Sequence, residues 1–251
     1  MKKMLLALAI AFIMLMPGLA QASSFKIGCG YSHTLSDDPI VFPDQAGASH
    51  SHDFFGNRAT DYESRISTLT GQPTTCGNAG DTAAYWVPSL YLNGSQVKPK
   101  SIVAYYYRKT SGTLTPFPQG LEMIAGDSHA TTTQSMSVVY WGCGSGSGIS
   151  KVTAPPDCTG IGHLRVHISF PDCWDGVNLD SANHKSHVAY HSGSSCPAAY
   201  PVQFPQLVIR VNYSLEDARS ITLASGSYVT EHADYYSVWD EATLAALVAS
   251  L

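Results

Sequence analysis

Three separated stretches of this sequence carry histidines at spacings that suit metal binding or acid–base chemistry. In the first, Ser49–Gly56, a single residue separates His50 from His52. Alternate side chains of an extended strand point the same way, so both imidazoles would face one metal ion or one substrate. Because His-x-His also occurs by chance, this stretch needs partners from elsewhere in the chain.

The second stretch, Phe170–Tyr190, concentrates titratable side chains around one cysteine. Its acidic and imidazole groups are Asp172, Asp175, Asp180, His184 and His187. A disulfide at Cys173 would hold such a loop rigidly, as a catalytic or metal site requires. Taken singly, the aspartates are better explained as turn caps, whereas for the two histidines a site and a solvated loop are equally open.

The third stretch, Glu231–Tyr236, again places two such groups two residues apart, at His232 and Asp234. We expect the three stretches to converge. The predicted metal ligands are His50, His52, His187, His232 and Asp234, around one divalent transition metal ion.

The same groups could instead work without a metal, because imidazole titrates near neutral pH and can exchange a proton with a sugar oxygen. For that chemistry the predicted catalytic residues are His50, His184, His187 and Asp175, with Asp53 as a further supporting carboxylate. A structural hydrogen-bonding network is the third alternative. No Gly-x-Ser-x-Gly, phosphate-binding glycine loop or His-Glu-x-x-His is present.

Other candidates carry less weight. His163 and His167 share the polar side of an alternating strand, so we expect both to be exposed. His33, His129 and His191 are isolated in the sequence. Strand aromatics could stack on sugars, although a core position is the first expectation for them. They are Trp86, Tyr91, Tyr105, Tyr106 and Tyr107.

The first 22 residues resemble a secretory signal peptide. Lys2 and Lys3 precede an apolar run over Met4–Met16, and cleavage is expected after Ala22. The remaining 251 − 22 = 229 residues form, by prediction, a single β-rich domain, residues 23–251, that is secreted or periplasmic. Loss of the two lysines gives a formal charge of −5 − 2 = −7, which disfavours nucleic-acid binding. No later run suits a membrane span.

All six cysteines follow the predicted leader, and an even number in an exported chain favours three disulfides. Six cysteines allow about 15 pairings. Proximity along the chain suggests Cys143–Cys158 and Cys173–Cys196, which leaves Cys29–Cys76.

Short apolar stretches rich in Val, Ile and Tyr, with only 13% charged residues, predict a mainly β fold. We expect an antiparallel, jelly-roll-like β-sandwich with long loops. The predicted strands are Tyr85–Leu92, Ser101–Tyr107, Ser135–Trp141, His163–Phe170, Leu207–Tyr213 and Ser227–Thr230. A C-terminal helix capped by Asp240 should pack on the sheet through Leu244, Leu247, Val248 and Leu251.

A series of short motifs occurs in a fixed order along the chain. They are Asp38–Val41, Ser49–His52 with Phe55–Gly56, Tyr85–Tyr91, Phe117–Gly120 with Met123–Asp127, Phe170–Gly176, Asn178–Asp180, His184–Tyr190, Cys196–Pro197, and His232–Asp234 with Trp239–Asp240. Over nearly the whole mature chain, this pattern resembles the secreted family catalogued as domain of unknown function nineteen ninety-six.

The resemblance implies little about mechanism. Similar domains occur in exported proteins, sometimes beside carbohydrate-binding modules, which implies a cell-wall or extracellular polysaccharide partner. His50, His52, His184, His187 and His232 fall on the family pattern, whereas His163, His167 and His191 do not.

The leading functional hypothesis is an exported enzyme, a hydrolase or lyase, acting on extracellular or cell-wall glycans through the histidine-rich site. The alternative is a non-enzymatic carbohydrate- or metal-binding module at the cell surface, such as a metal carrier.

Overall fold

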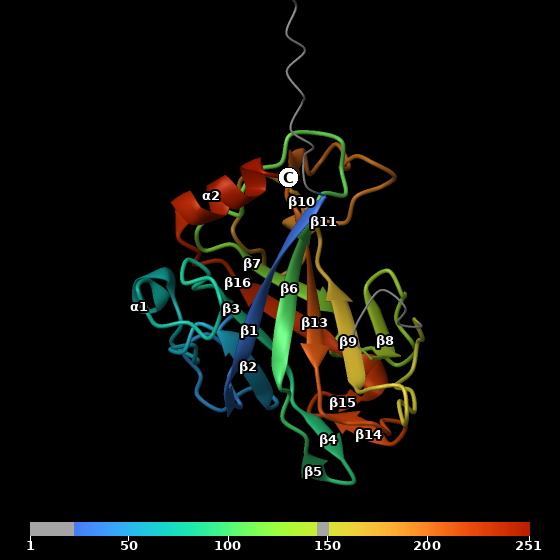
Figure 1. Cartoon of the computed structure of the whole chain (residues 1–251). Helices are drawn as coiled ribbons and strands as arrows, with labels where there is room; N and C mark the ends of the chain where they lie inside the picture. The colour runs from blue at the N-terminus through green and yellow to red at the C-terminus, as the bar shows by residue number, and fades with distance from the viewer. Residues whose placement is uncertain (1–22, 145–150) are drawn as a thin grey trace, which may run out of the picture.

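The structure is a computed structural model that describes residues 23–144 and 151–251. The predicted signal peptide, residues 1–22, lies outside the described residues, so export stays a prediction. The fold is mainly β with antiparallel strands, as the sequence predicts (Figure 1). In the described part of the chain, no helix has the length and apolar character needed to cross a membrane.

The largest sheet has nine strands in the order β7-β16-β3-β2-β1-β6-β13-β9-β8. Their bounds are β1 Ser24–Leu35, β2 His52–Gly56, β3 Ala84–Pro88, β6 Ser101–Tyr107, β7 Glu122–Gly126, β8 Val139–Cys143, β9 Leu164–Ser169, β13 Gln206–Asn212 and β16 His232–Tyr236. Every pairing in this sheet is antiparallel.

Two smaller sheets and three short helices complete the described elements. One sheet has the order β15-β14-β4-β5 and the other the order β11-β10-β12. Their bounds are β4 Leu90–Leu92, β5 Ser95–Gln96, β10 Cys173–Trp174, β11 Val188–Ala189, β12 Val202–Gln203, β14 Ile221–Leu223 and β15 Gly226–Ser227, and the helices are α1 Ile66–Leu69, the 3-10 helix η1 Tyr228–Thr230 and α2 Glu241–Ala249.

The nine-stranded sheet bends so that its two halves enclose one core, which makes the fold sandwich- or barrel-like. Strand β1 belongs to both halves, pairing with β2 on one side and β6 on the other, and its register with β2 shifts between Tyr31 and His33. Tyr85 of β3 and Tyr106 of β6 meet inside the core, where their hydroxyls lie 2.7 Å apart.

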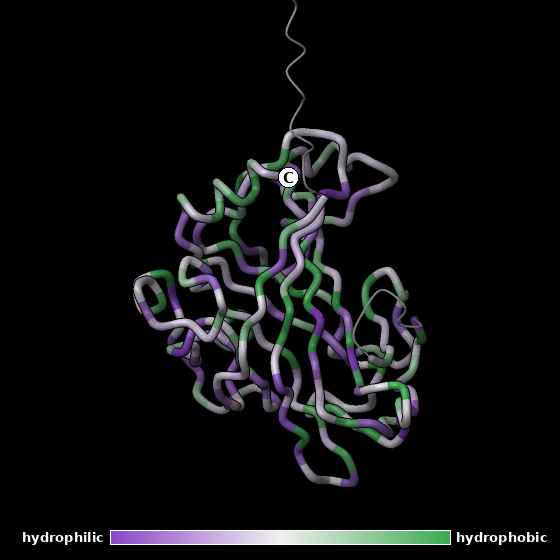
Figure 2. Tube along the Cα trace, viewed as in Figure 1, coloured by the Kyte–Doolittle hydropathy of each residue, from purple (hydrophilic) through white to green (hydrophobic). Residues whose placement is uncertain are grey.

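Alternation along the strands then decides which side chains face outward. In β16, Ala233 and Tyr235 enter the shared core, which leaves His232 and Asp234 on the outward side of this half. In β6 the burial pattern alternates strictly between half-buried and buried residues. Hydrophobic and hydrophilic stretches accordingly intermingle along the central strands in Figure 2.

Four of the six predicted strands are found within one or two residues of their expected bounds, although Tyr85–Leu92 is interrupted at Ser89. Two predictions are wrong. The strand expected at Ser135–Trp141 begins only at Val139, and Ser227–Thr230 is mostly the helix η1. The strands β1, β7 and β16 were not predicted, and β2 was expected only as an extended stretch around His50 and His52.

The C-terminal helix and the disulfides follow the sequence predictions. The Asp240 carboxylate accepts a hydrogen bond from Thr243 N, and Leu244 and Val248 are buried in the main core. Leu247 is only partly buried. The disulfides join Cys29 to Cys76, Cys143 to Cys158 and Cys173 to Cys196.

Candidate functional site

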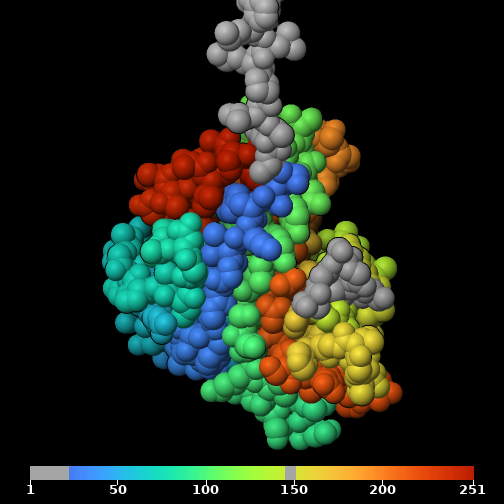
Figure 3. All heavy atoms as spheres, viewed as in Figure 1, coloured from blue at the N-terminus to red at the C-terminus, as the bar shows by residue number. Residues whose placement is uncertain are grey.

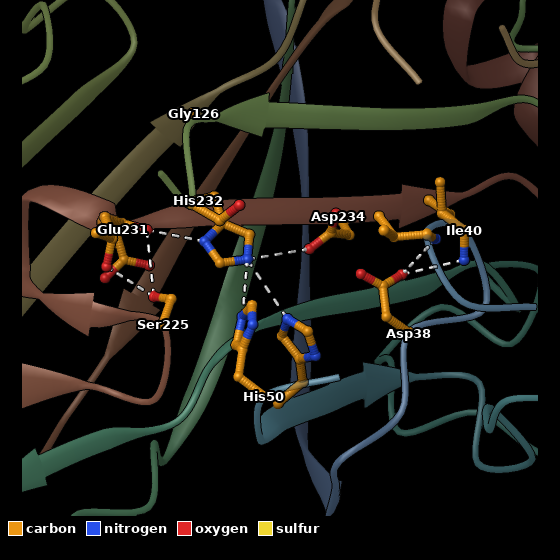
Figure 4. A network of polar contacts seen from close by, with 12 residues as sticks. Asp38, Ile40, His50, Gly126, Ser225, Glu231, His232 and Asp234 are labelled. Atoms are coloured by element: carbon orange, nitrogen blue, oxygen red, sulfur yellow. Dashed lines mark hydrogen bonds and ion pairs between the residues drawn. The ribbon is translucent and has the colours of Figure 1, made fainter. Parts of the chain in front are cut away.

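The first and third histidine stretches converge at one end of the outward face formed by β2 and β16. His232 begins β16 and His52 begins β2, whereas His50 lies in the segment just before β2. The Nε2 atom of His232 lies 3.2 Å from that of His50 and 3.4 Å from that of His52 (Figure 4). The three side chains therefore form an imidazole cluster at the meeting point of segments some 180 residues apart.

The ring orientation of two of these histidines is fixed by backbone carbonyls. His52 Nδ1 lies 3.0 Å from the carbonyl oxygen of Asp37, and His232 Nδ1 lies 2.9 Å from that of Thr230. A carbonyl oxygen only accepts, so both Nδ1 atoms must donate and both Nε2 atoms carry a lone pair. Two lone pairs thus face each other across 3.4 Å.

Burial disfavours the protonation that would place a hydrogen between these two Nε2 atoms. His52 is fully buried and His232 is 3% exposed, whereas His50 is half-buried. Desolvation, reinforced by the neighbouring imidazoles, lowers the pKa of His52 well below its usual value. Desolvation likewise lowers the pKa of His232 to about 3. Both rings are therefore neutral at physiological pH, and each can offer its Nε2 to a cation.

The spacing of the nitrogens fits a metal ion. Zn–N bonds of about 2.0–2.1 Å in a tetrahedral site place neighbouring ligand nitrogens about 3.3–3.4 Å apart. The two measured separations, 3.2 and 3.4 Å, lie close to that edge length. The three ligand atoms all lie within 4.8 Å of one another.

A buried carboxylate lies beside the cluster. Asp234 is 1% exposed, and neither of its carboxylate oxygens has a hydrogen-bond partner. One of them lies 3.9 Å from His232 Nε2, and Figure 4 shows Asp234 on the same side of β16 as His232. Desolvation, together with the negative charge of Asp38, raises the pKa of Asp234 well above its usual value. A cation in the cluster would supply the missing partner.

Strand β7, the neighbour of β16, packs closely against His232. Gly126 of β7 pairs with His232, and its φ of +83° with Glu231 O only 2.5 Å from a built Cβ leaves no space for a side chain. Lys185 reaches in from the second histidine stretch and donates a hydrogen bond of 2.6 Å to the Gly126 carbonyl. That stretch thus approaches the cluster through a lysine that the sequence analysis did not single out.

His184 belongs to a second group of close polar side chains. Its Nδ1 lies 2.9 and 3.0 Å from the two carboxylate oxygens of Asp180, and Glu122 of β7 completes the group within 4.8 Å. Burial, with the charges of Asp180 and Asp38, raises the pKa of Glu122 to about 8. His184 therefore does not join the imidazole cluster but forms a neighbouring carboxylate–imidazole group.

His187 lies outside both groups. Its Nε2 donates to the Glu122 carbonyl at 2.7 Å, and its Nδ1 lies 3.0 Å from the Ser181 hydroxyl. The ring is 1% exposed and holds the loop against β7 with both nitrogens engaged. We expected His187 to lie beside His50, and the structure instead places it against Glu122 and Ser181.

The two predicted supporting carboxylates also lie elsewhere. Asp175 caps a turn, accepting from the backbone N–H groups of Val177 and Asn178. Asp53 points to the opposite side of β2 from His52, where it accepts hydrogen bonds from the Thr34 hydroxyl and the Gln96 amide.

The expectation for His167 is wrong. Only 8% of this residue is exposed, because its ring stacks on Tyr140 at 4.3 Å between centroids. His163 is exposed as predicted, and the exposed His129 lies close enough to His50 to help burial lower the pKa of that ring. A third close group, Cys29, Cys76 and Asp81, has its two sulfurs joined in a disulfide, so it offers no thiolate.

Sequence reasoning did not identify Asp38 and Glu122 as site residues. Asp38 lies in a loop, where it accepts hydrogen bonds from the backbone of Ile40 and Val41. It was matched only as part of a motif, and Glu122 stands alone in an apolar run, so neither had a spacing that predicts chemistry.

The comparisons with known proteins agree with the motif pattern. A family model described as domain of unknown function (DUF1996) matches residues 38–239, a span that includes all three members of the imidazole cluster. No curated protein and no solved structure matches the chain. The chain therefore belongs to the DUF1996 family.

Proposed function

We propose that this member of the DUF1996 family binds one divalent transition metal ion through His50, His52 and His232, and that it is an exported enzyme acting on extracellular or cell-wall glycans. The observation that carries the metal assignment is the pair of fixed Nε2 lone pairs, His52 and His232, facing each other 3.4 Å apart in a buried site. Imidazole suits zinc, copper, iron and nickel.

The ligand arrangement favours catalysis over simple storage. Three protein ligands leave at least one coordination position free, as in catalytic zinc sites. The half-buried His50 marks the side from which a substrate can approach. When bound, such an ion supplies a Lewis acid and lowers the pKa of coordinated water.

The side chains around the cluster have complementary tasks in hydrolysis or elimination. The carbonyls of Asp37 and Thr230 hold two imidazoles in register, which keeps their Nε2 atoms directed at one point. Asp234, buried next to them, can store and return a proton. Lys185 adds a positive charge for an anionic group of the substrate.

The glycan substrate rests on the family resemblance and on the predicted export. The competing candidate is a non-enzymatic metal- or carbohydrate-binding module, which the same imidazoles would also serve. Product formation separates the two, because a module binds glycan without changing it.

The first measurement is elemental analysis of untagged protein, with one metal ion per chain expected. The second is chromatography of cell-wall polysaccharides after incubation, where new reducing or unsaturated ends are expected for the metal-loaded protein and lost after chelation. His52→Asn should remove both metal and products, because asparagine can still donate to the Asp37 carbonyl but has no Nε2.

His163→Asn is the matched control, since His163 is exposed and distant in sequence from the cluster. It should keep the metal content and the products of the unmodified chain. Metal-free protein would refute the metal assignment, and stoichiometric metal with no product from any glycan would support the binding module instead.

A further inference from the structure

The outward face of the other half of the sheet carries a groove of about 990 Å³. It runs over β1, β6, β13, β9 and β8, which are neighbours in the sheet (Figure 1). Figure 3 shows β1, β6, β13 and β9 side by side on one face of the molecule. Because alternate residues of β6 and β13 fill the core, the intervening ones project into this groove.

Four cations line the groove: Lys26, Lys109, Lys151 and Arg210. Among the described residues, no aspartate or glutamate lines it and none of these four cations forms an ion pair. The whole chain has a formal charge of −5, so this gathering of positive charge is a local feature. Charge complementarity calls for an anionic ligand.

Aromatic rings stand between the cations. Tyr105 and Tyr107 stack with an interplanar angle of 9°, and Tyr140 stacks on His167 with an angle of 13°. Lys109 lies 4.9 Å from the Tyr107 ring centroid and Lys151 lies 4.6 Å from that of Tyr140. The three tyrosine rings are half-buried, whereas His167 is buried.

Polar side chains also line the groove. His167, which is 8% exposed, has a buried Nε2 atom with no hydrogen-bond partner beneath the lining, and the buried Nε of Arg210 is likewise unpartnered. Ser169 and Gln206 add a hydroxyl and an amide to the lining. Such groups suit sugar hydroxyls, which both donate and accept.

We propose that this groove binds an acidic polysaccharide, whose sugar rings pack on the Tyr105–Tyr107 stack and whose anionic groups meet Lys26, Lys109, Lys151 and Arg210. A nucleic acid also combines anions with stacking faces. It is the less favoured occupant, because its dense charge would be repelled by the acidic remainder of the chain.

The site is independent of the imidazole cluster, since the two lie on the outward faces of different halves of the sheet. Binding should therefore survive chelation. This separates failure of the groove from failure of the proposed metal site.

The test is calorimetric titration of the full mature chain, in chelator, with oligogalacturonate, dextran sulfate, a neutral malto-oligosaccharide of matched length and oligothymidylate. We expect at least one acidic glycan to bind with an affinity that falls as salt rises. The neutral glycan should bind at least about tenfold more weakly, since it cannot use the cations. Tyr107→Ala should weaken binding by about 2- to 12-fold through the lost stacking.

Lys109→Ala should weaken binding as well, whereas Lys98→Ala is the matched control. Lys98 makes the same lysine-over-tyrosine contact, 5.3 Å from the Tyr31 centroid, but lies outside the groove. Equal affinity for the neutral glycan, tighter binding of oligothymidylate, absence of any binding, or equal losses in Lys98→Ala and Lys109→Ala would each overturn the proposal. Thermal unfolding of each variant checks that the fold is intact.

Discussion

Replacing one imidazole of the cluster should weaken metal binding strongly while leaving the stability of the metal-free fold nearly unchanged. The informative change is His232→Asn. Asparagine keeps a donor for the Thr230 carbonyl, which His232 Nδ1 contacts at 2.9 Å, but it removes Nε2. Without metal, that Nε2 faces the lone pair of His52 and can accept a hydrogen bond only from His50 Nε2, 3.2 Å away. Its loss should therefore lower the free energy of unfolding by no more than about 1.5 kcal/mol, the net contribution of one hydrogen bond.

With metal the two proteins should differ strongly. At a free zinc concentration 1,000 times its dissociation constant, a single site stabilises the fold by about 4.1 kcal/mol. For a domain of this size, that free energy corresponds to a rise of about 8–16 °C in Tm. Losing one of three ligands should weaken binding by at least the roughly 100-fold that loss of an outer-shell partner can cost. The remaining stabilisation by zinc is then at most about 1.4 kcal/mol, a rise in Tm of at most about 3–6 °C.

The assay is thermal unfolding of both proteins in chelator and in buffered zinc, with His163→Asn as the control. The control should show the full zinc-dependent rise. If zinc, copper, iron and nickel leave the Tm of the unmodified chain unchanged, or if zinc raises the Tm of His232→Asn by the same amount as that of the unmodified chain, the three nitrogens do not bind a metal together. A large loss of stability in chelator would instead indicate a structural network.

Two further predictions concern the core. Burial raises the pKa of Asp81 from 3.8 to about 8, so the folded chain keeps a proton there that the unfolded chain has released; the stabilisation is complete below pH 4 and is lost as pH rises toward 8. Relative to Asp81→Asn, the unmodified chain should lose about 1.4 kcal/mol of unfolding free energy per pH unit between pH 5 and 7 in urea titrations, and parallel profiles would contradict this. Leu244→Ala in α2, where Leu244 is 1% exposed, should cost about 2–5 kcal/mol in the same assay, and a loss no larger than that of the half-buried Leu247→Ala would contradict the packing of α2 on the core.

The sequence predicts the central strands well because their apolar residues alternate. Ser101–Tyr107 has this pattern, and β6 has the predicted bounds. The strand β1 was missed because its glycines interrupt the apolar positions, although Cys29 and Ile27 enter the core. Strand β16 was missed because a buried strand with His232 and Asp234 on its outward side resembles a polar loop in sequence.

The site was predicted in part for a related reason. Spacing identified His50, His52 and His232, whose positions in the chain suit a shared point once β2 and β16 lie in one sheet. Spacing could not show that both ring nitrogens of His187 are engaged by Glu122 and Ser181, because Glu122 lies on the distant strand β7 and Ser181 is reached only through the fold of the loop. It also gave no sign that Asp38 lies close enough to Asp234 for its charge to raise the pKa of that carboxyl.

The bend of the sheet at β1 has a functional consequence for the two proposed sites. Lys26 in the first part of β1 faces the cationic groove, while beyond the register shift at Tyr31–His33 the strand pairs with β2, which carries His52. A polymer lying in the groove is thus held on one side of the core and the imidazole cluster lies on the other. The groove would retain the protein on a polysaccharide, while only a segment that passes around the sheet edge could reach the metal. Chelation should therefore abolish product formation but leave retention on an acidic polysaccharide column unchanged, whereas coupled loss of both would place polymer and metal in one site and contradict the separation that the strand alternation defines.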